Sequence, residues 1–204
     1  PSRGIAGGVE EGLAQVGGTA AAVGFLGHGT TVATNALIEH KGVLTGLIVT
    51  DGFRDLLEIG RQKRPSLYDL HANKPEILVT RDLRFEVAER LRYDGSIETP
   101  LDLEAVRVAA RHLKAAGVKA VAICFLYGFV NPVHEVAARQ VIEEEIPDAF
   151  ICASHEVAPE FREFERLSTA TVNAYLGPVM KRYIRRLQER FAAIGLAVEP
   201  NLTQ

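Results

Sequence analysis

The 204-residue sequence lacks a long apolar run, an excess of positive charge and all but two cysteines. No apolar stretch approaches the roughly 18 residues that a membrane-spanning helix needs, so we expect no membrane partner. The formal net charge of −3 at pH 7 disfavours a nucleic-acid partner, since such proteins usually present a basic face. The first residues also lack the charged, apolar and small-residue order of a secretory signal. Together these absences favour a cytoplasmic protein.

The two cysteines, Cys124 and Cys152, each lie inside an apolar run that is typical of a buried strand. We expect free thiols in a reducing cytosol, because structural disulfides are uncommon there. A disulfide between the two is the alternative.

Several nucleotide-binding and catalytic motifs are also absent. No Lys-Ser or Lys-Thr pair follows the glycines of "GFLGHGTTVATNAL" (24–37), so this segment is not a Walker A loop, and Gly27-His28-Gly29 is not completed to G-x-G-x-x-G. The strings "VHEVAAR" and "SHEVAPE" lack the second histidine of the H-E-x-x-H zinc motif. No G-x-S-x-G nucleophile elbow occurs. We therefore expect no metal centre in this chain.

Apolar and amphipathic segments alternate along the chain, and its 47% hydrophobic and 24% charged residues are ordinary for a globular protein. The expected strands are 21–27, 43–50, 118–127 and 149–154. The expected helices are 5–16, 30–42, 51–59, 102–116, 132–145 and 159–194. Because apolar strands alternate with helices, we predict an α/β fold with a mostly parallel sheet flanked by helices on both faces.

Two local signals interrupt this alternation. Asp94-Gly95 predicts a two-residue hairpin turn, and it follows a segment with Phe85, Val87, Leu91 and Tyr93 on one face and arginines on the other. Gly177-Pro178 predicts a kink or a break in the last helical region. We therefore expect a β-hairpin insertion in the α/β fold.

The segment "GFLGHGTTVATNAL" has the properties of a site for an oxyanion or a phosphate. Its glycines let backbone N–H groups approach a ligand, and a helix that begins at Thr30 would favour negative charge. Threonine hydroxyls add donors, and His28 stands where the carboxyl end of a strand would present it. The alternative is a capped helix with an incidental histidine.

Three longer strings, "HGTTVATNALIEHKG", "TGLIVTDGFRDLLEIGRQKRPSLYDL" and "APEFREFERLSTATVNAYLGPVMKRYIRRL", closely resemble the hydantoinase A/5-oxoprolinase family. That family includes ATP-dependent N-methylhydantoinase A subunits, 5-oxoprolinase and related subunits of acetone and acetophenone carboxylases. The resemblance covers nearly the whole chain in the expected order. It implies a nucleotide-binding core of the sugar-kinase, Hsp70 and actin superfold.

Members of this family begin with an acidic, glycine-rich D-x-G-G-T-x-T-D phosphate loop, which this sequence does not contain. We therefore expect residues 1–204 to be a partial hydantoinase/oxoprolinase N-terminal region, with the helical part Phe161–Ile194 leading into the hydantoinase A domain. The resemblance implies that ATP and Mg²⁺ bind mainly outside this fragment. It also implies a hydantoinase B-type subunit or domain as the partner.

The resemblance implies an ATP-dependent cyclic amidohydrolase that phosphorylates an unreactive carbonyl oxygen before ring-opening hydrolysis. Phosphoryl transfer depends chiefly on positioning and charge neutralisation. The expected catalytic residues are His28, Thr30 and Thr31. The expected substrate-binding residues are Gly29, Thr34, Asn35 and Arg61, the last through its bidentate guanidinium.

Two alternatives stay open. Within the family, the substrate can be a small ketone that is carboxylated, as in acetone carboxylase. Outside it, the chain can be a non-catalytic α/β binding or assembly module, which the missing phosphate loop favours. The Glu and Arg residues of "EFREFERLSTATVNAY" are expected mainly to form surface pairs or to serve packing, with a site role as the alternative.

Overall fold

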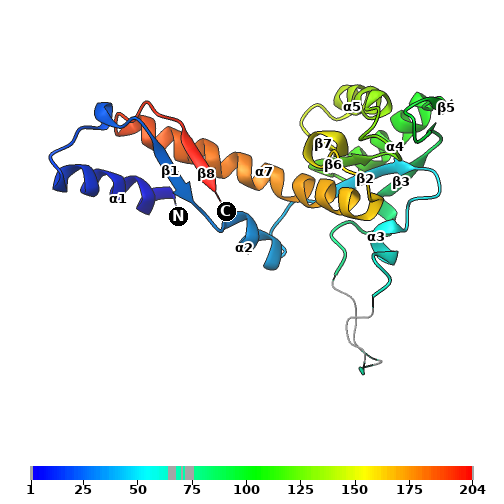
Figure 1. The fold of residues 1–204 in the computed structure, drawn as a ribbon, viewed down its shortest axis with the longest axis horizontal. Helices are drawn as coiled ribbons and strands as arrows, with labels where there is room; N and C mark the ends of the chain where they lie inside the picture. The colour runs from blue at the N-terminus through cyan, green and yellow to red at the C-terminus, as the bar shows by residue number, and fades with distance from the viewer. Residues whose placement is uncertain (1, 64–67, 70, 72–75, 204) are drawn as a thin grey trace. The chain divides into compact units, whose positions relative to one another are not determined.

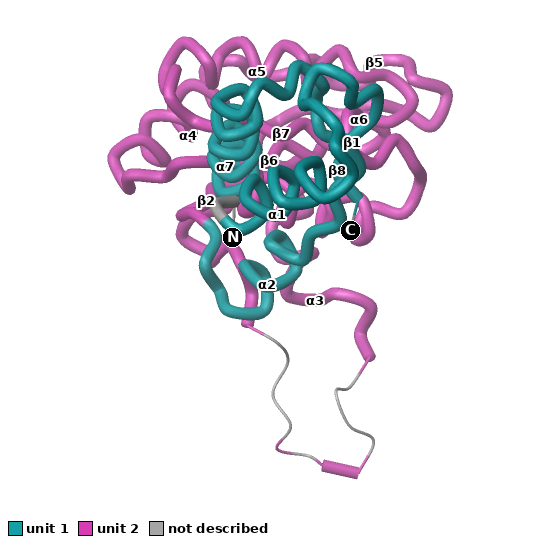
Figure 2. Tube along the Cα trace, turned by 90° about the vertical axis from the view of Figure 1, so that its left-hand side faces the viewer, with its two compact units in different colours: residues 1–42, 178–204 teal, residues 43–177 magenta. Residues whose placement is uncertain are grey.

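The computed structural model describes residues 2–63, 68, 69, 71 and 76–203 (Figure 1). The chain divides into two compact units (Figure 2). One consists of residues 1–42 and 178–204, and the other of residues 43–177. Each unit has its own hydrophobic core, so each is described by itself.

The centre of unit 43–177 is a four-stranded parallel sheet in the order β3-β2-β6-β7. Its strands are β2 (Thr45–Thr50), β3 (Arg84–Val87), β6 (Ala120–Cys124) and β7 (Phe150–Ala153). The register places Leu47 opposite Ala122, and Ala122 opposite Cys152. Every residue of β2 and β6 is buried, as expected for a parallel sheet covered on both faces. The predicted α/β class is confirmed, and both cysteines are free and buried.

Helices cover this sheet. They are α3 (Leu56–Ile59), the 3₁₀ turn η2 (Arg81–Leu83), α4 (Leu103–Ala115), α5 (Val133–Glu145), α6 (Ser154–Val157) and the first half of α7 (Glu163–Ala193). Helix α4 begins where it does because the Asp102 carboxylate accepts a hydrogen bond from the Ala105 N–H at 2.9 Å. Its apolar stripe is buried, and Leu167, Ala170 and Ala174 of α7 join the same core.

A β-hairpin follows β3, as predicted. Strand β4 (Arg90–Leu91) pairs antiparallel with β5 (Ile97–Thr99). The turn is one residue longer than the predicted two-residue turn, because the Arg92 N–H donates to the Ser96 carbonyl across three residues. Gly95 has a φ of +82° there, a conformation that glycine adopts without strain.

The other unit contains α1 (Ser2–Gln15), the 3₁₀ turn η1 (Ala20–Ala22), β1 (Leu26–Gly29), α2 (Val32–Ile38), β8 (Pro200–Thr203) and the second half of α7. Strands β1 and β8 form a parallel pair in which His28 lies opposite Leu202. Tyr183, Leu187 and Phe191 of α7 form the core together with Ala6 of α1.

Several predicted boundaries are wrong; the helix predicted at 51–59, for example, begins at Leu56. The strand predicted at 21–27 lies at Leu26–Gly29, because its pairing with β8 draws the glycine-rich motif itself into a strand. The helix predicted over 30–42 ends at Ile38, where the chain turns through His40 with a φ of +51°. Helix α7 runs unbroken through Pro178.

In the part of the chain that the structure describes, no helix combines the length and the apolar character needed to cross a membrane.

Gly177 of α7 is required by close packing. A Cβ at this position would lie 2.3 Å from Cε1 of Phe150, so we expect Gly177→Ala to lower the free energy of unfolding by about 1–3 kcal/mol. The matched control is Gly8→Ala in α1, where a Cβ would meet no atom within 4 Å. Urea denaturation of both variants measures the difference, and a Gly177→Ala variant as stable as the wild type would contradict this packing.

Candidate functional site

The segment at His28 forms the end of β1 and the turn into α2. The His28 Nε2 atom lies 2.6 Å from the hydroxyl of Tyr183, a core residue on α7 that is 9% exposed. The Thr30 N–H donates to the Thr203 carbonyl at 3.0 Å, which extends the β1–β8 ladder by one bond. His28 is thus a half-buried side chain with one ring nitrogen engaged by the core of its own unit.

The threonines that follow have local partners. The Thr30 hydroxyl accepts from the Val32 N–H at 3.3 Å, and the Thr31 hydroxyl accepts from the Asn35 amide at 3.4 Å. Thr31 is the N-cap residue of α2, but its side chain makes no capping hydrogen bond. Thr31, Thr34 and Asn35 are exposed on the first turns of α2. The structure therefore brings the predicted residues from His28 to Asn35 together on one exposed turn.

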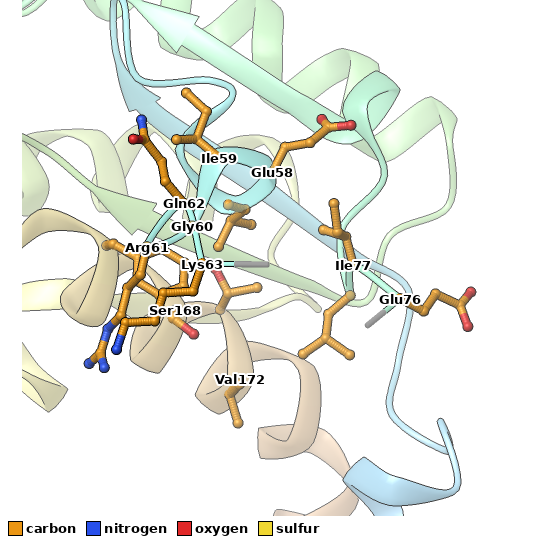
Figure 3. A pocket seen from close by; sticks show the side chains of 14 residues that line it. Glu58, Ile59, Gly60, Arg61, Gln62, Lys63, Glu76, Ile77, Ser168 and Val172 are labelled. Carbon is orange, nitrogen blue, oxygen red and sulfur yellow. The ribbon is translucent and has the colours of Figure 1, made fainter. Parts of the chain in front are cut away.

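Arg61, the remaining predicted binding residue, lies in the other unit. It follows α3, and its Nε and Nη2 atoms lie 2.8 and 2.7 Å from Oε1 of Glu165 on α7. Its side chain lines a cavity between α3, the segment 76–78 and α7 (Figure 3). Its role as a substrate ligand stays a prediction.

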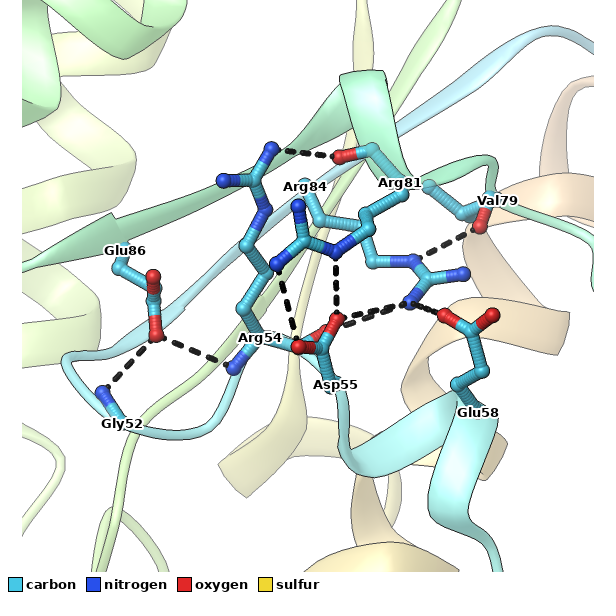
Figure 4. Close-up of polar contacts among 8 residues, drawn as sticks. All are labelled: Gly52, Arg54, Asp55, Glu58, Val79, Arg81, Arg84 and Glu86. Atoms are coloured by element: carbon cyan, nitrogen blue, oxygen red, sulfur yellow. Dashed lines mark hydrogen bonds and ion pairs between the residues drawn. The ribbon is translucent and has the colours of Figure 1, made fainter.

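An arginine-rich cluster fixes the start of α3 (Figure 4). Arg84 at the start of β3 is 2% exposed, and it donates to the Val79 carbonyl at 2.9 Å and to Glu58 at 3.1 Å. Arg81 forms two hydrogen bonds with Asp55, which lower the pKa of that carboxyl group. The sequence does not reveal that Arg84 is buried, where carboxylate and carbonyl oxygens partner its guanidinium.

The carboxyl ends of the parallel strands hold two buried carboxylates that the sequence motifs do not reveal. Glu89, just after β3, accepts a hydrogen bond from the Thr50 hydroxyl at the end of β2, and its other oxygen lies 2.7 Å from Nδ1 of His134. The Thr50 hydroxyl also accepts from the Leu126 N–H at 2.8 Å. This network connects the ends of β2, β3 and β6.

Glu135 of α5 is the second buried carboxylate and is 0% exposed. Its Oε1 atom accepts from the Phe125 N–H at 2.9 Å and from the Ser154 hydroxyl at 2.5 Å. Its Oε2 atom accepts from the His155 N–H at 3.0 Å and lies 2.7 Å from Nδ1 of His155. Buried Arg166 of α7 donates to Ser154 at 3.0 Å and lies 3.9 Å from Glu135.

The protonation states follow from these contacts. Burial opposes ionisation of Glu135, but hydrogen bonds from His155, Ser154 and two backbone N–H groups outweigh it, so the pKa of Glu135 is lowered. The hydrogen bond to Glu135 raises the pKa of His155. Burial raises the pKa of the nearby Cys124 thiol to about 12, which excludes it as a ready nucleophile.

No described histidine, cysteine, aspartate or glutamate belongs to a group of three or more that could hold a metal ion. In neither His-Glu pair do the two neighbours in sequence contact each other through their side chains. His134 contacts Glu89, and Glu135 contacts His155. Within "EFREFERLSTATVNAY", Glu165 pairs with Arg61 of a distant segment, and Arg166 is buried at 1% exposure.

Comparison with known protein families places the chain in one of them. Residues 1–146 match the family described as "Hydantoinase/oxoprolinase N-terminal region". The alpha subunit of caprolactamase from Pseudomonas jessenii is 45% identical over 170 residues, which are 82% of this chain and 24% of that subunit. The chain thus spans about a quarter of the length of this relative.

Two solved structures share the fold. The crystal structure of ATP-dependent caprolactamase from Pseudomonas jessenii has a TM-score of 0.83 at 40% identity, over 95% of this chain and 30% of that chain. The nucleotide-free structure of acetone carboxylase has a TM-score of 0.87 at 25% identity, over 98% of this chain and 31% of that chain. Likeness to two ATP-dependent enzymes is consistent with the predicted sugar-kinase, Hsp70 and actin superfold.

Glu135 carries a negative charge that Arg166 and His155 balance. We expect Glu135→Gln to lower the free energy of unfolding by about 3–5 kcal/mol, because it leaves the Arg166 guanidinium buried beside a neutral amide. The control Glu144→Gln removes an exposed partner of Arg107 and is expected to cost about 0.5 kcal/mol or less. Chemical denaturation compares the two, and similar small losses would refute a structural role for Glu135.

The ion pair between His155 and Glu135 also predicts a pH dependence. Because the folded pKa of His155 is raised, its stabilising contribution is complete below about pH 6.5, the ordinary pKa of histidine, and is lost as pH rises through the folded pKa. The difference in unfolding free energy between wild type and His155→Gln should therefore shrink from pH 6 to pH 9. His112→Gln, on the exposed face of α4, is the control; a difference that is constant with pH would exclude the charged pair.

Proposed function

The chain belongs to the hydantoinase/oxoprolinase N-terminal family, and on that premise we propose that it forms part of an ATP-dependent subunit that activates the carbonyl of a cyclic amide for ring-opening hydrolysis. The observation that carries the proposal is the 45% identity to the caprolactamase alpha subunit over 82% of the chain. The solved relative of the same name is described as ATP-dependent. These proteins are enzymes of the class that the sequence motifs imply.

His28 is the donor that we assign to the carbonyl oxygen. A Tyr183 hydroxyl that donates to Nε2 leaves the proton of a neutral imidazole on Nδ1. Among the described residues Nδ1 has no hydrogen-bond partner, so it can serve a ligand. Thr30 and Thr31 follow on the same turn, and their hydroxyl protons are the further donors to the substrate oxygen or the transferred phosphoryl group.

The binding residues in this proposal are Gly29, Thr34, Asn35 and Arg61. Gly29 has no side chain, which lets the backbone approach a ligand closely. Thr34 and Asn35 are exposed on α2 and are assigned to the substrate ring. Arg61, in the other unit, is assigned to an anionic group of the substrate. Helix α2 has seven residues, so the donors are the side chains and the backbone of the turn rather than a long helix dipole.

ATP supplies the phosphoryl group that turns the carbonyl oxygen into a leaving group. The residues of this chain do not fit a complete site for ATP and Mg²⁺, because the sequence has no acidic, glycine-rich phosphate loop and the described residues hold no cluster of metal ligands. We place the nucleotide and Mg²⁺ mainly on segments outside residues 1–204. The contribution of this chain is the orientation of the carbonyl.

The family also suggests the surroundings of the chain. The relatives include subunits, such as caprolactamase alpha, and we propose a hydantoinase B-type subunit or domain as the hydrolytic partner in the cytoplasm. We further propose that residues 1–204 are part of the N-terminal region and that 161–194 lead into the hydantoinase A domain.

Ketone carboxylation is the second candidate. The likeness to acetone carboxylase favours it, because the superposition with that structure covers 98% of the chain with a TM-score of 0.87. That protein is 25% identical to this chain, whereas the caprolactamase subunit is 45% identical in sequence, so we rank the cyclic amide first.

The test uses the complete subunit with its partner. ADP formation is measured with caprolactam, hydantoin, 5-oxoproline, or acetone with bicarbonate. We expect a cyclic amide to stimulate it, and His28→Ala to lower the stimulated kcat about 100-fold, as for removal of an oxyanion donor. Thr31→Ala should lower kcat in the same direction.

His112→Ala on α4 is the matched control and should keep full turnover. Stimulation by acetone and bicarbonate alone would select the carboxylase instead. Unchanged turnover of a folded His28→Ala variant would contradict the assignment of His28 as the donor to the carbonyl oxygen and leave the turn a structural role only.

A further inference from the structure

We propose that the cavity between α3 and α7 in unit 43–177 binds a small organic carboxylate with a compact apolar body. The inference deepens the proposed function and rests on it, because Arg61, which that proposal assigns to an anionic group of the substrate, lines this cavity. Its test measures binding without nucleotide or turnover, so its failure is distinguishable from a failure of the His28 assignment. It depends on the size of the cavity, its apolar lining and the charges at one end of it.

The cavity has a volume of about 710 Å³, within the range of small-molecule sites. Apolar side chains from three segments converge on it: Leu57, Ile59, Ile77, Leu78, Phe164 and Val172. Ile59 is 46% exposed at α3, so a ligand with an apolar body would remove apolar surface from water there. An aliphatic or aromatic ring suits this lining.

Two cations stand at one end of the cavity. Arg61 and Lys63 both line it (Figure 3). The guanidinium of Arg61 is held by Glu165, which fixes its direction. Among the residues that the structure describes, Lys63 has no acidic partner, so its ammonium group is available to a ligand.

Glu165 pairs with Arg61, so Lys63 is the cation left for a ligand at this end. The Glu58 carboxylate pairs with the buried Arg84 guanidinium at 3.1 Å. Glu76 stands at the opposite end from Arg61 and Lys63, and its carboxylate points away from them (Figure 3). The cavity therefore has a basic end and an apolar body, which matches a carboxylate attached to a ring.

The basic end is built by an unusual backbone. Gly60 and Gln62 both have positive φ, +57° and +54°. A left-handed glutamine is uncommon, and such residues cluster where a binding surface constrains the chain. The backbone conformations of Gly60 and Gln62 determine the direction of the chain between the end of α3 and Lys63.

A buried hydroxyl supplies a second polar contact. Thr171 lines the cavity at 2% exposure, and its hydroxyl has no hydrogen-bond partner in the described part of the chain. A threonine in a helix has two accessible χ1 rotamers, and rotation between them exchanges the positions of methyl and hydroxyl. A second polar atom on the ligand would satisfy this hydroxyl.

Isothermal titration calorimetry of the complete subunit without nucleotide tests the proposal. The three probes have the same ring: cyclohexanecarboxylate, its uncharged carboxamide, and cyclohexylammonium. We expect the carboxylate to bind about fivefold tighter than the carboxamide, the size of an exposed ion pair, and the ammonium to bind more weakly still.

Two variants locate the site. Lys63→Gln should remove the preference for the carboxylate and leave carboxamide binding unchanged, while Lys114→Gln on α4 should change neither. Val172→Phe should weaken all three probes about tenfold by filling the cavity. Equal affinities for the three probes, no binding, or a carboxylate preference that survives Lys63→Gln would overturn the proposal, and none of these results bears on ATP turnover.

Discussion

The buried carboxylate of Glu135 is the interaction on which unit 43–177 depends. It projects from α5 and accepts hydrogen bonds from Phe125 at the end of β6, and from Ser154 and His155 just after β7. A single side chain thus satisfies donors from two strand ends and holds the start of α6. The Glu135 carboxylate fits here because residue 128 is a glycine: a Cβ at this position would lie 2.7 Å from Oε1 of Glu135.

This arrangement closes the edge where open parallel sheets usually bind ligands. Ligand sites in such folds lie outside the carboxyl ends of the strands, at the point where the strand order reverses. Here the order β3-β2-β6-β7 reverses between β2 and β6. At that point the Thr50 hydroxyl donates a hydrogen bond to Glu89 and accepts one from the Leu126 N–H. The cavity to which we assign ligand binding lies elsewhere in the described part of this unit, between α3 and α7.

Much of the fold follows from local sequence. The apolar runs of β2 and β6, the Asp102 cap of α4 and the Asp94-Gly95 hairpin were all predictable, because their determinants lie within a few residues. The position of β1 was not, because its partner β8 lies more than 150 residues away in sequence and the pairing alone makes Gly27–Gly29 a strand.

The buried networks were unpredictable for the same reason. The sequence shows His134-Glu135 and His155-Glu156 as two similar pairs. Neither is followed by the second histidine of the H-E-x-x-H zinc motif. Only the parallel register of β6 and β7 brings His155 to Glu135. The turn at His28 was singled out from its glycines and hydroxyls, but its contact with Tyr183 depends on the packing of α7. Its catalytic role stays a prediction.

The central claim is that the carbonyl oxygen of a cyclic amide is phosphorylated before water opens the ring. The direct measurement supplies the complete enzyme with ATP and a lactam labelled with ¹⁸O at its carbonyl, and follows the label by mass spectrometry of the inorganic phosphate. Phosphorylation places the labelled oxygen between carbon and phosphorus, water adds to that carbon, the C–N bond breaks with the amine leaving, and cleavage of the C–O bond of the resulting acyl phosphate releases phosphate. The account therefore predicts one ¹⁸O atom in each phosphate released. If the label stays in the ring-opened carboxylate and the phosphate carries none, this sequence ending in C–O cleavage is contradicted.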